Sequence, residues 1–121
     1  MLRNDFFTFT ALQVEGDTVT TNIAFNAAHP IFNGHFPNQP IVPGVCMMQM
    51  VKEITQGHIN KKIQLIKATD LKFLSFINPN QSESIVLKLK INSDEQSVRI
   101  DARLINEANV LFKCKGVFGI K

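Results

Sequence analysis

The sequence contains no tryptophan and no tyrosine, so its aromatic side chains are ten phenylalanines. Because a phenylalanine ring carries no hydrogen-bonding group, a stacking platform for a base or a sugar would have to be built from purely apolar rings. The sequence also lacks any run of five or more basic residues. These absences disfavour nucleic-acid binding and favour an apolar interior and apolar ligands.

Cysteine is nearly absent, since the chain has only Cys46 and Cys114, which lie 68 positions apart. Neither belongs to a CxxC pair or a Cys/His metal-ligand spacing, so we expect free, mostly buried thiols in a reducing compartment and no bound metal. One observation favours a reactive Cys46: it lies near the predicted start of the helix, and a helix N-terminus lowers the pKa of a thiol. The first residues are charged, and no apolar run approaches the roughly 18 residues of a membrane span. We therefore expect a soluble, cytoplasmic protein.

The composition that is present predicts one globular domain over residues 1–121, with 45% hydrophobic and 19% charged residues. The net charge of +3 is uneven, because residues 1–51 sum to −2 and residues 52–121 to +5. The second part could therefore present a basic face to an acidic partner. The alternative is that lysines simply occupy the solvent side of exposed strands.

Alternation of apolar and polar residues predicts a sheet on both sides of a central segment. Residues 6–14 and 18–26 are predicted to form a hairpin around Glu15-Gly16-Asp17. Further strands are predicted over residues 63–77, 83–91, 98–104 and 111–120, with short links that imply antiparallel neighbours. The order predicts an α+β protein in which one long helix packs on an antiparallel sheet of about five to six strands.

The helix is predicted from Val45 to Ile54, with Pro43 in its first turn and a stop near Gly57. Its methionines are interpreted as core residues. Four polar residues recur at i, i+3, i+4 and i+7 and form one polar stripe on this helix. They are Gln49, Lys52, Glu53 and Gln56.

Residues 27–43 contain four of the five prolines, which exclude a helix or a central strand there and predict a stiff loop. His35 lies in this loop and titrates near neutral pH, so it is a candidate general base. Just beyond the loop, the backbone N–H of Gly44 lies at the positive end of the helix and could polarise a carbonyl. A base and a carbonyl polariser are the minimum needed to remove a proton next to a thioester.

A histidine beside proline and glycine is more often a structural residue whose ring is satisfied by the backbone. This alternative applies to His35 as well. We assign His29 to it as a loop residue and His58 as an exposed residue just past the helix.

Residues 29–45 read HPIFNGHFPNQPIVPGV and resemble the signature of the beta-hydroxyacyl-acyl-carrier-protein dehydratases, with GHFP, a spaced proline and PGV before one long helix. Asp70-Leu71-Lys72-Phe73 resembles the strand that follows the helix in that family. The resemblance implies the hot-dog fold, in which the sheet wraps the helix and two protomers join their sheets side by side. It also implies an acyl tunnel at the dimer interface. The substrate would arrive on the phosphopantetheine arm of acyl carrier protein or coenzyme A, and no other cofactor is expected.

The resemblance also assigns roles to single residues. His35 matches the catalytic histidine, and Gly44 matches the glycine whose amide holds the thioester carbonyl. Substrate contacts near the tunnel mouth are expected from Phe36, Val42 and Val45, with Phe32 flanking the base on its other side. Phe73 and Phe76 are expected on the strand that faces the helix.

The family's second catalytic residue is a carboxylate fourteen positions after the histidine, and here that position is Gln49. A glutamine amide can orient a hydroxyl or a water but cannot titrate. Three interpretations stay open. Gln49 orients the hydroxyl while His35 moves the protons alone; Glu53, one turn further on, supplies the acid; or the chain pairs with a related subunit that carries the carboxylate.

The leading hypothesis is a dehydratase-like enzyme that removes water reversibly from a (3R)-hydroxyacyl thioester of acyl carrier protein, giving the trans-2-enoyl thioester in fatty-acid or related acyl-chain synthesis. Thioester hydrolysis, with Gln49 positioning a water, is the enzymatic alternative. The third hypothesis is an acyl-binding subunit that is inactive without a partner. We expect a homodimer or a heterodimer with a related hot-dog subunit, or a larger assembly, because a small domain with an open sheet edge is seldom a monomer.

Overall fold

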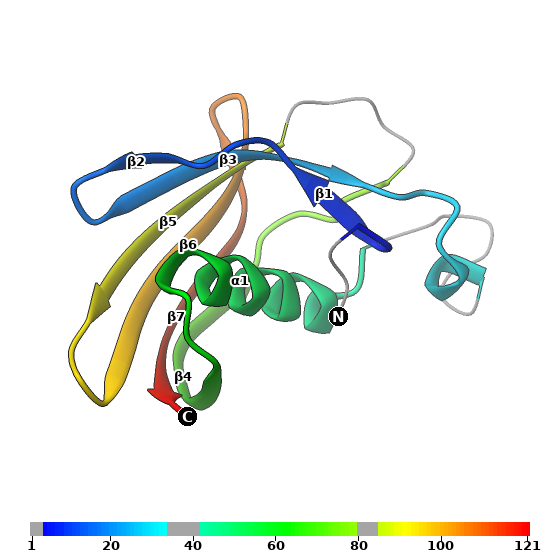
Figure 1. Cartoon of the computed structure of the whole chain (residues 1–121). Coiled ribbons are helices and arrows are strands. Elements are labelled where there is room, and N and C mark those ends of the chain that lie inside the picture. The colour runs from blue at the N-terminus through cyan, green and yellow to red at the C-terminus, as the bar shows by residue number, and fades with distance from the viewer. Residues whose placement is uncertain (1–3, 34–41, 80–84) are drawn as a thin grey trace.

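A computed structural model describes residues 4–33, 42–79 and 85–121, and within them one α-helix lies in the concave side of a curved antiparallel sheet (Figure 1). The described strands follow the order β1-β3-β5-β6-β7-β4, and β2 pairs with β3. The predicted α+β architecture is confirmed, with seven described strands where five to six were expected. The elements are β1 (Phe7–Phe9), β2 (Gln13–Glu15), β3 (Thr18–Phe25), the 3-10 helix η1 (Pro30–Asn33), α1 (Gly44–Ile59), β4 (Ile63–Phe73), β5 (Ile85–Ser93), β6 (Ser97–Asn106) and β7 (Asn109–Ile120).

The additional strand arises at Thr10, where the strand predicted over residues 6–14 divides into β1 and β2. The backbone N–H of Asn22 donates to Oγ1 of Thr10 (3.1 Å), and Oγ1 of Thr21 donates to the Thr10 carbonyl (2.8 Å). Side-chain hydroxyls therefore take the place of ladder partners here and interrupt the strand. The predicted hairpin turn is confirmed, with Gly16 at φ 62°.

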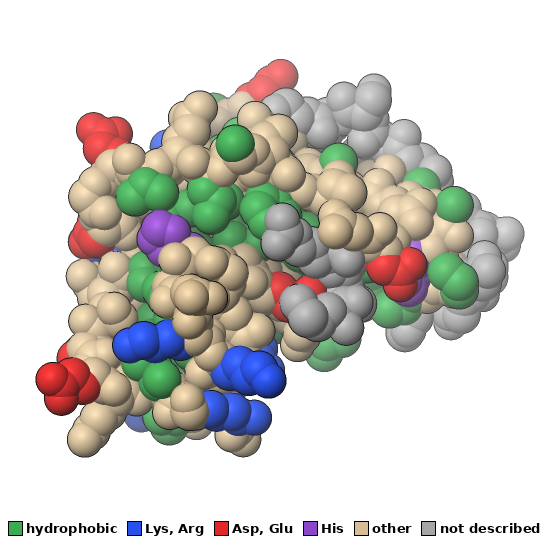
Figure 2. Space-filling model, viewed as in Figure 1, with side chains coloured by type: hydrophobic (Ala, Val, Ile, Leu, Met, Phe, Trp, Pro, Cys, Tyr) green, Lys and Arg blue, Asp and Glu red, His purple; other side chains and the backbone are tan. Residues whose placement is uncertain are grey.

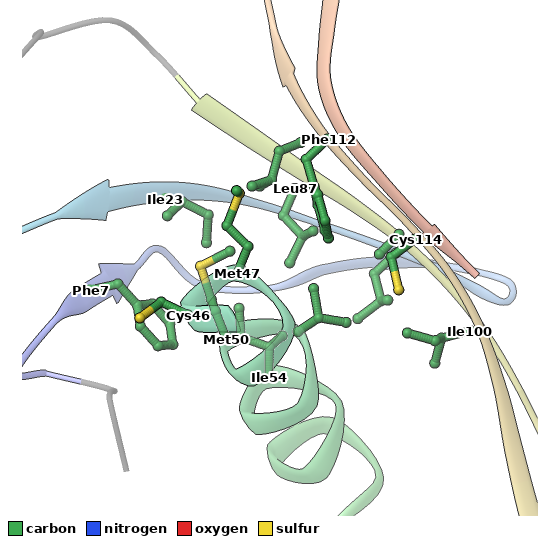
Figure 3. Packing of buried hydrophobic residues seen from close by; sticks show 14 of the residues in the cluster. Phe7, Ile23, Cys46, Met47, Met50, Ile54, Leu87, Ile100, Phe112 and Cys114 are labelled. Atoms are coloured by element: carbon green, nitrogen blue, oxygen red, sulfur yellow. The ribbon is translucent and has the colours of Figure 1, made fainter. Parts of the chain in front are cut away.

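The apolar face of α1 fixes the helix on the sheet. Met47, Met50 and Ile54 are buried and point toward Leu87 and Phe112 on the strands (Figure 3). Each such side chain contributes about 1.5–3 kcal/mol by leaving water. The methionines are therefore core residues, as predicted.

The predicted helix stop near Gly57 is wrong, because α1 continues to Ile59. Asn60 ends the helix in the left-handed region (φ 56°), and the capping N–H donates to the Gln56 carbonyl. Asparagine tolerates this conformation better than most residues, so it serves as the cap in place of glycine.

The strand predicted over residues 63–77 is also shorter than expected, since β4 ends at Phe73. The N–H groups of Leu74 and Ser75 both donate to the Leu111 carbonyl (2.9 and 3.2 Å), which turns the chain out of the ladder. Phe76 lies beyond the end of β4 and is 82% exposed, so the expectation that it belongs to the strand that faces the helix is wrong.

The predicted alternation is confirmed on β5, β6 and β7, whereas β4 is exposed along most of its length. On β5, Leu87 and Leu89 are fully buried while Lys88 and Lys90 are exposed on the other side. Figure 2 shows Lys and Arg side chains gathered on the lower part of one face, near the end of α1 and the start of β4. In the described ranges no helix is both long enough and apolar enough to cross a membrane.

Candidate functional site

The described chain is firmly attached on both sides of residues 34–41, a range that lies outside the described residues and contains His35 and Phe36. Before it, the ring of Phe32 is buried and stacks on Phe6, with ring centroids 5.5 Å apart. After it, the N–H of Val42 donates to the Ile77 carbonyl (2.9 Å), and Val42 is buried. Phe32 and Val42, both expected near the substrate, are thus core residues that hold the chain on either side of residues 34–41.

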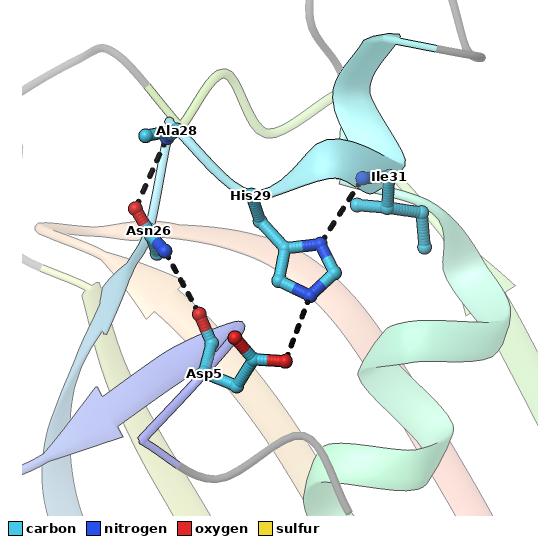
Figure 4. A network of polar contacts seen from close by, with 5 residues as sticks. All are labelled: Asp5, Asn26, Ala28, His29 and Ile31. Carbon is cyan, nitrogen blue, oxygen red and sulfur yellow. Dashed lines mark hydrogen bonds and ion pairs between the residues drawn. The ribbon is translucent and has the colours of Figure 1, made fainter.

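His29 lies just before residues 34–41 and helps to hold the chain in place there (Figure 4). Its Nδ1 accepts a hydrogen bond from the N–H of Ile31 (3.1 Å), so the ring hydrogen is on Nε2 and donates to Oδ2 of Asp5 (3.2 Å). The ring also meets Phe6 edge-on at 5.3 Å. Both nitrogens are engaged in local structure, which agrees with the structural role predicted for His29. His58 is exposed, in the last turn of α1 rather than just past it.

The start of α1 provides free backbone donors. Pro43 precedes the helix in an extended conformation and has no side chain able to cap it. The first hydrogen bonds of the helix run from Cys46 and Met47 to the Pro43 carbonyl, at 3.1 and 3.3 Å. Within the described part of the chain, the N–H groups of Gly44 and Val45 have no acceptor. Such amides, at the positive end of a helix, suit an oxygen that becomes negative during a reaction.

Phe73 covers one side of the start of α1. The sequence did not predict this residue as part of the site. A Cβ on Gly44 would lie 2.5 Å from two atoms of the Phe73 ring. The same ring packs against Phe112 at 5.2 Å and keeps about half of its surface exposed. Glycine at position 44 therefore makes room for this ring. The signal was available, since Phe73 was expected on the strand that faces the helix.

Gln49 is held by a neighbour on its own helix. Its Nε2 donates to Oε2 of Glu53 at 3.0 Å, one turn further along α1. Glu53 is only 5% exposed, so the predicted polar stripe is not a solvated face at this position. The amide therefore has a defined orientation, with Oε1 and the second hydrogen of Nε2 left for other partners. One turn before Gln49, Val45 is 78% exposed.

The two cysteines are free and buried, as predicted. Burial raises the pKa of the Cys46 thiol, so the proposed lowering by the helix N-terminus does not prevail and the argument for a reactive Cys46 fails. Burial, with the nearby carboxylates of Asp101 and Asp70, raises the pKa of Cys114 to about 11. With raised pKa values, both thiols are protonated near neutral pH.

Comparisons with known proteins agree with the resemblance. A sequence model of the ApeI-like family, described as ApeI dehydratase, matches residues 11–113. The chain is 26% identical to the 3-hydroxyacyl-[acyl-carrier-protein] dehydratase FabZ of Chlamydia pneumoniae over 115 residues, which cover 84% of this chain and 74% of the relative.

Solved structures show the same arrangement of helix and sheet. The dehydratase heterocomplex ApeI:P from Xenorhabdus doucetiae is similar with a TM-score of 0.73 and 17% identity, covering 92% of this chain and 96% of that one. A hypothetical thioesterase from Streptococcus pneumoniae, solved with coenzyme A, gives a TM-score of 0.66 at 7% identity, covering 98% and 91%. At such identities these likenesses establish the fold alone.

Proposed function

Because the chain belongs to the ApeI-like dehydratase family and has the hot-dog fold, we propose that it catalyses the reversible loss of water from a (3R)-hydroxyacyl thioester carried by acyl carrier protein. The observation that carries the proposal is the start of α1. There, the backbone N–H groups of Gly44 and Val45, which have no acceptor among the described residues, share one helix with the fixed side-chain amide of Gln49. A thioester oxygen at the amides would place the β-hydroxyl within reach of a polar side chain on the same helix.

In this mechanism His35 removes the proton from the α carbon, and the negative charge that develops on the thioester oxygen is stabilised by the N–H of Gly44. The C–O bond at the β carbon then breaks as the C=C bond forms. The hydroxide leaves as water after taking the proton held by His35. Gln49, oriented by Glu53, holds the hydroxyl through its free amide atoms but supplies no proton of its own.

The test is hydration of a trans-2-enoyl thioester of acyl carrier protein, followed by mass spectrometry of the acyl group. His35→Ala should lower the rate about 10²–10⁴-fold, the usual contribution of a general acid–base group. His58→Ala is the matched control, since it removes an exposed histidine from the last turn of α1 and should retain full activity. Full activity of His35→Ala would exclude the mechanism. Release of free thiol with no change at the double bond would instead indicate a thioesterase.

A second candidate function is one subunit of a heteromeric dehydratase. Two observations favour it: position 49 carries no carboxylate, and the edge strand β4 exposes large apolar side chains to solvent. These are Leu65, Ile66, Leu71 and Phe73. A second hot-dog chain that pairs with this edge could bring the missing carboxylate.

Purification of the chain alone and together with a second hot-dog chain, with native mass measurement and the same assay, distinguishes the two candidates. Activity that appears only in a mixed assembly supports the subunit role. Equal activity of the chain alone and of the mixture contradicts it.

A further inference from the structure

The ring of Phe73 fills the space that a side chain at position 44 would occupy. A Cβ on Gly44 would lie 2.5 Å from Cε1 and Cζ of this ring and 3.3 Å from Cε2. Carbon atoms that are not bonded to each other prefer a separation of about 3.5–4.0 Å, so only a residue without a Cβ fits here. The far edge of the ring therefore lies against the Gly44 backbone, beside its N–H.

The ring is supported on its other side by the core. It packs on Phe112 of β7, with ring centroids 5.2 Å apart and an interplanar angle of 32°. Phe112 is fully buried and is the direct partner of Phe73 in the ladder between β4 and β7. Protein interiors are packed densely, so a ring supported in this way gives little room to a ligand. Phe73 thus forms a firm wall beside Gly44.

The part of this ring that does not contact the core is open. Phe73 is 51% exposed, and Val45, which follows Gly44, is 78% exposed. These two apolar side chains lie beside the N–H groups of Gly44 and Val45, which have no acceptor in the described ranges. Sites for small molecules commonly combine a few polar groups that orient the ligand with apolar surface that contacts the rest of it.

The inference that follows rests on the proposed function, in which the thioester oxygen accepts a hydrogen bond from the N–H of Gly44. The oxygen then lies about 2.9 Å from the nitrogen, and the carbonyl carbon carries sulfur on one side and the α carbon on the other. The pantetheine arm beyond the sulfur contains amide groups, whereas the acyl chain is apolar and suits an apolar ring. An α carbon that carries only hydrogen fits beside Phe73, but an added methyl group would collide with the ring.

We propose that Phe73 is a specificity-determining residue that restricts the substrates to acyl thioesters without a branch at the α carbon. The ring acts by occupying space and takes no part in moving protons. One methyl group more or less in an apolar site changes kcat/KM about 10–200-fold, which sets the size of the effect.

The experiment compares hydration of two trans-2-enoyl thioesters of acyl carrier protein, one unbranched and one with a methyl group on the α carbon. The ratio of their kcat/KM values, unbranched over branched, should fall about tenfold in Phe73→Leu and in Phe73→Ala, since neither side chain has the atoms that contact Gly44. Both thioesters meet the same protein sample, so a loss of folded protein alone leaves the ratio unchanged. An unchanged ratio in both variants would overturn the proposal.

Phe76→Leu is the matched control, because it removes the same ring from an 82% exposed residue beyond the end of β4. Its ratio should equal that of the wild type, and a fall as large as in Phe73→Leu would refute a specific role of the ring beside Gly44.

A wild-type protein that hydrates neither thioester would contradict the proposed function, and the selectivity is then measured by calorimetric titration with the same two thioesters. Tighter binding of the unbranched thioester that is lost in Phe73→Leu supports the role of Phe73. Equal binding of the two by the wild type, or binding of neither, overturns it.

Discussion

The protonation state of a carboxylate introduced at position 49 depends on the neighbouring carboxyl group of Glu53. Gln49→Glu places a second carboxyl about 3 Å from that of Glu53, and two carboxyls that close cannot both ionise, so one keeps a proton near neutral pH. A protonated carboxyl is a general acid that can protonate the leaving hydroxyl, so the dehydration rate of the chain alone should rise about 10²–10⁴-fold. The measurement is loss of water from a (3R)-hydroxyacyl thioester of acyl carrier protein across a pH series.

The companion variant removes the second carboxyl. With Gln49→Glu and Glu53→Gln combined, the introduced group should titrate closer to its ordinary pKa and carry its proton only at lower pH. The optimum should therefore move toward acid relative to the single variant. An unchanged rate in Gln49→Glu would mean that a missing acid does not limit this protein.

The buried thiols give a prediction on pH. Because the pKa of Cys114 is raised to about 11 in the folded protein, the thiol stays protonated where an exposed cysteine is already a thiolate. Alkylation by iodoacetamide at about pH 9 should therefore be more than tenfold slower in the native protein than in urea. Above the ordinary value of 9.0 the unfolded chain loses this proton first, so the free energy of unfolding should fall as pH rises toward 11.

Cys46→Ser and Cys114→Ser separate the two thiols in that experiment, and mass spectrometry counts the added groups. Rapid labelling of the native Cys46→Ser variant, in which Cys114 is the remaining thiol, would contradict the assignment of Cys114 as buried and inert.

At the scale of elements, the end of α1 offers a matched pair of substitutions. Gly57 lies inside the helix, and a Cβ there would have no atom within 4 Å, so Gly57→Ala should stabilise the protein by about 0.5–1 kcal/mol. Asn60→Ala replaces an asparagine, whose polar side chain makes the left-handed region tolerable, with a residue that lacks this support, and should cost about 1 kcal/mol. Urea unfolding measures both changes. Opposite signs would place the helix end near Gly57, as the sequence predicts.

The strand pattern was predictable because burial on one face imposes a period of two, as on β5 with its alternating leucines and lysines. Element ends were less predictable. Two left-handed candidates, Gly57 and Asn60, lie near the end of α1, and only packing selects between them. The end of β4 depends on the Leu111 carbonyl, nearly forty residues away in the chain. The pairing of Gln49 with Glu53 follows from i, i+4 spacing, but the burial of Glu53 does not.

At the scale of the whole molecule, β4 is the edge through which two chains could join. Ile66 on this strand is 66% exposed, and Ile66→Lys should convert an assembled form to monomers by adding charge to an apolar edge. Val14→Lys, on β2 at the other side of the sheet and 54% exposed, should leave the assembly unchanged. Native mass spectrometry reads out both variants. Loss of assembly in Val14→Lys alone would place the interface elsewhere.

The position of Phe73, over the start of α1, is suited to a fluorescent probe of this region. With neither tryptophan nor tyrosine in the chain, the protein emits almost no intrinsic fluorescence in the range where those residues emit. A single Phe73→Trp substitution would therefore give one indole signal against a dark background, at a half-exposed position beside the amides of Gly44 and Val45. An acyl chain that binds beside this residue should shift the wavelength of the indole emission maximum. A tryptophan brought by a partner protein could likewise be followed on its own in the unmodified chain.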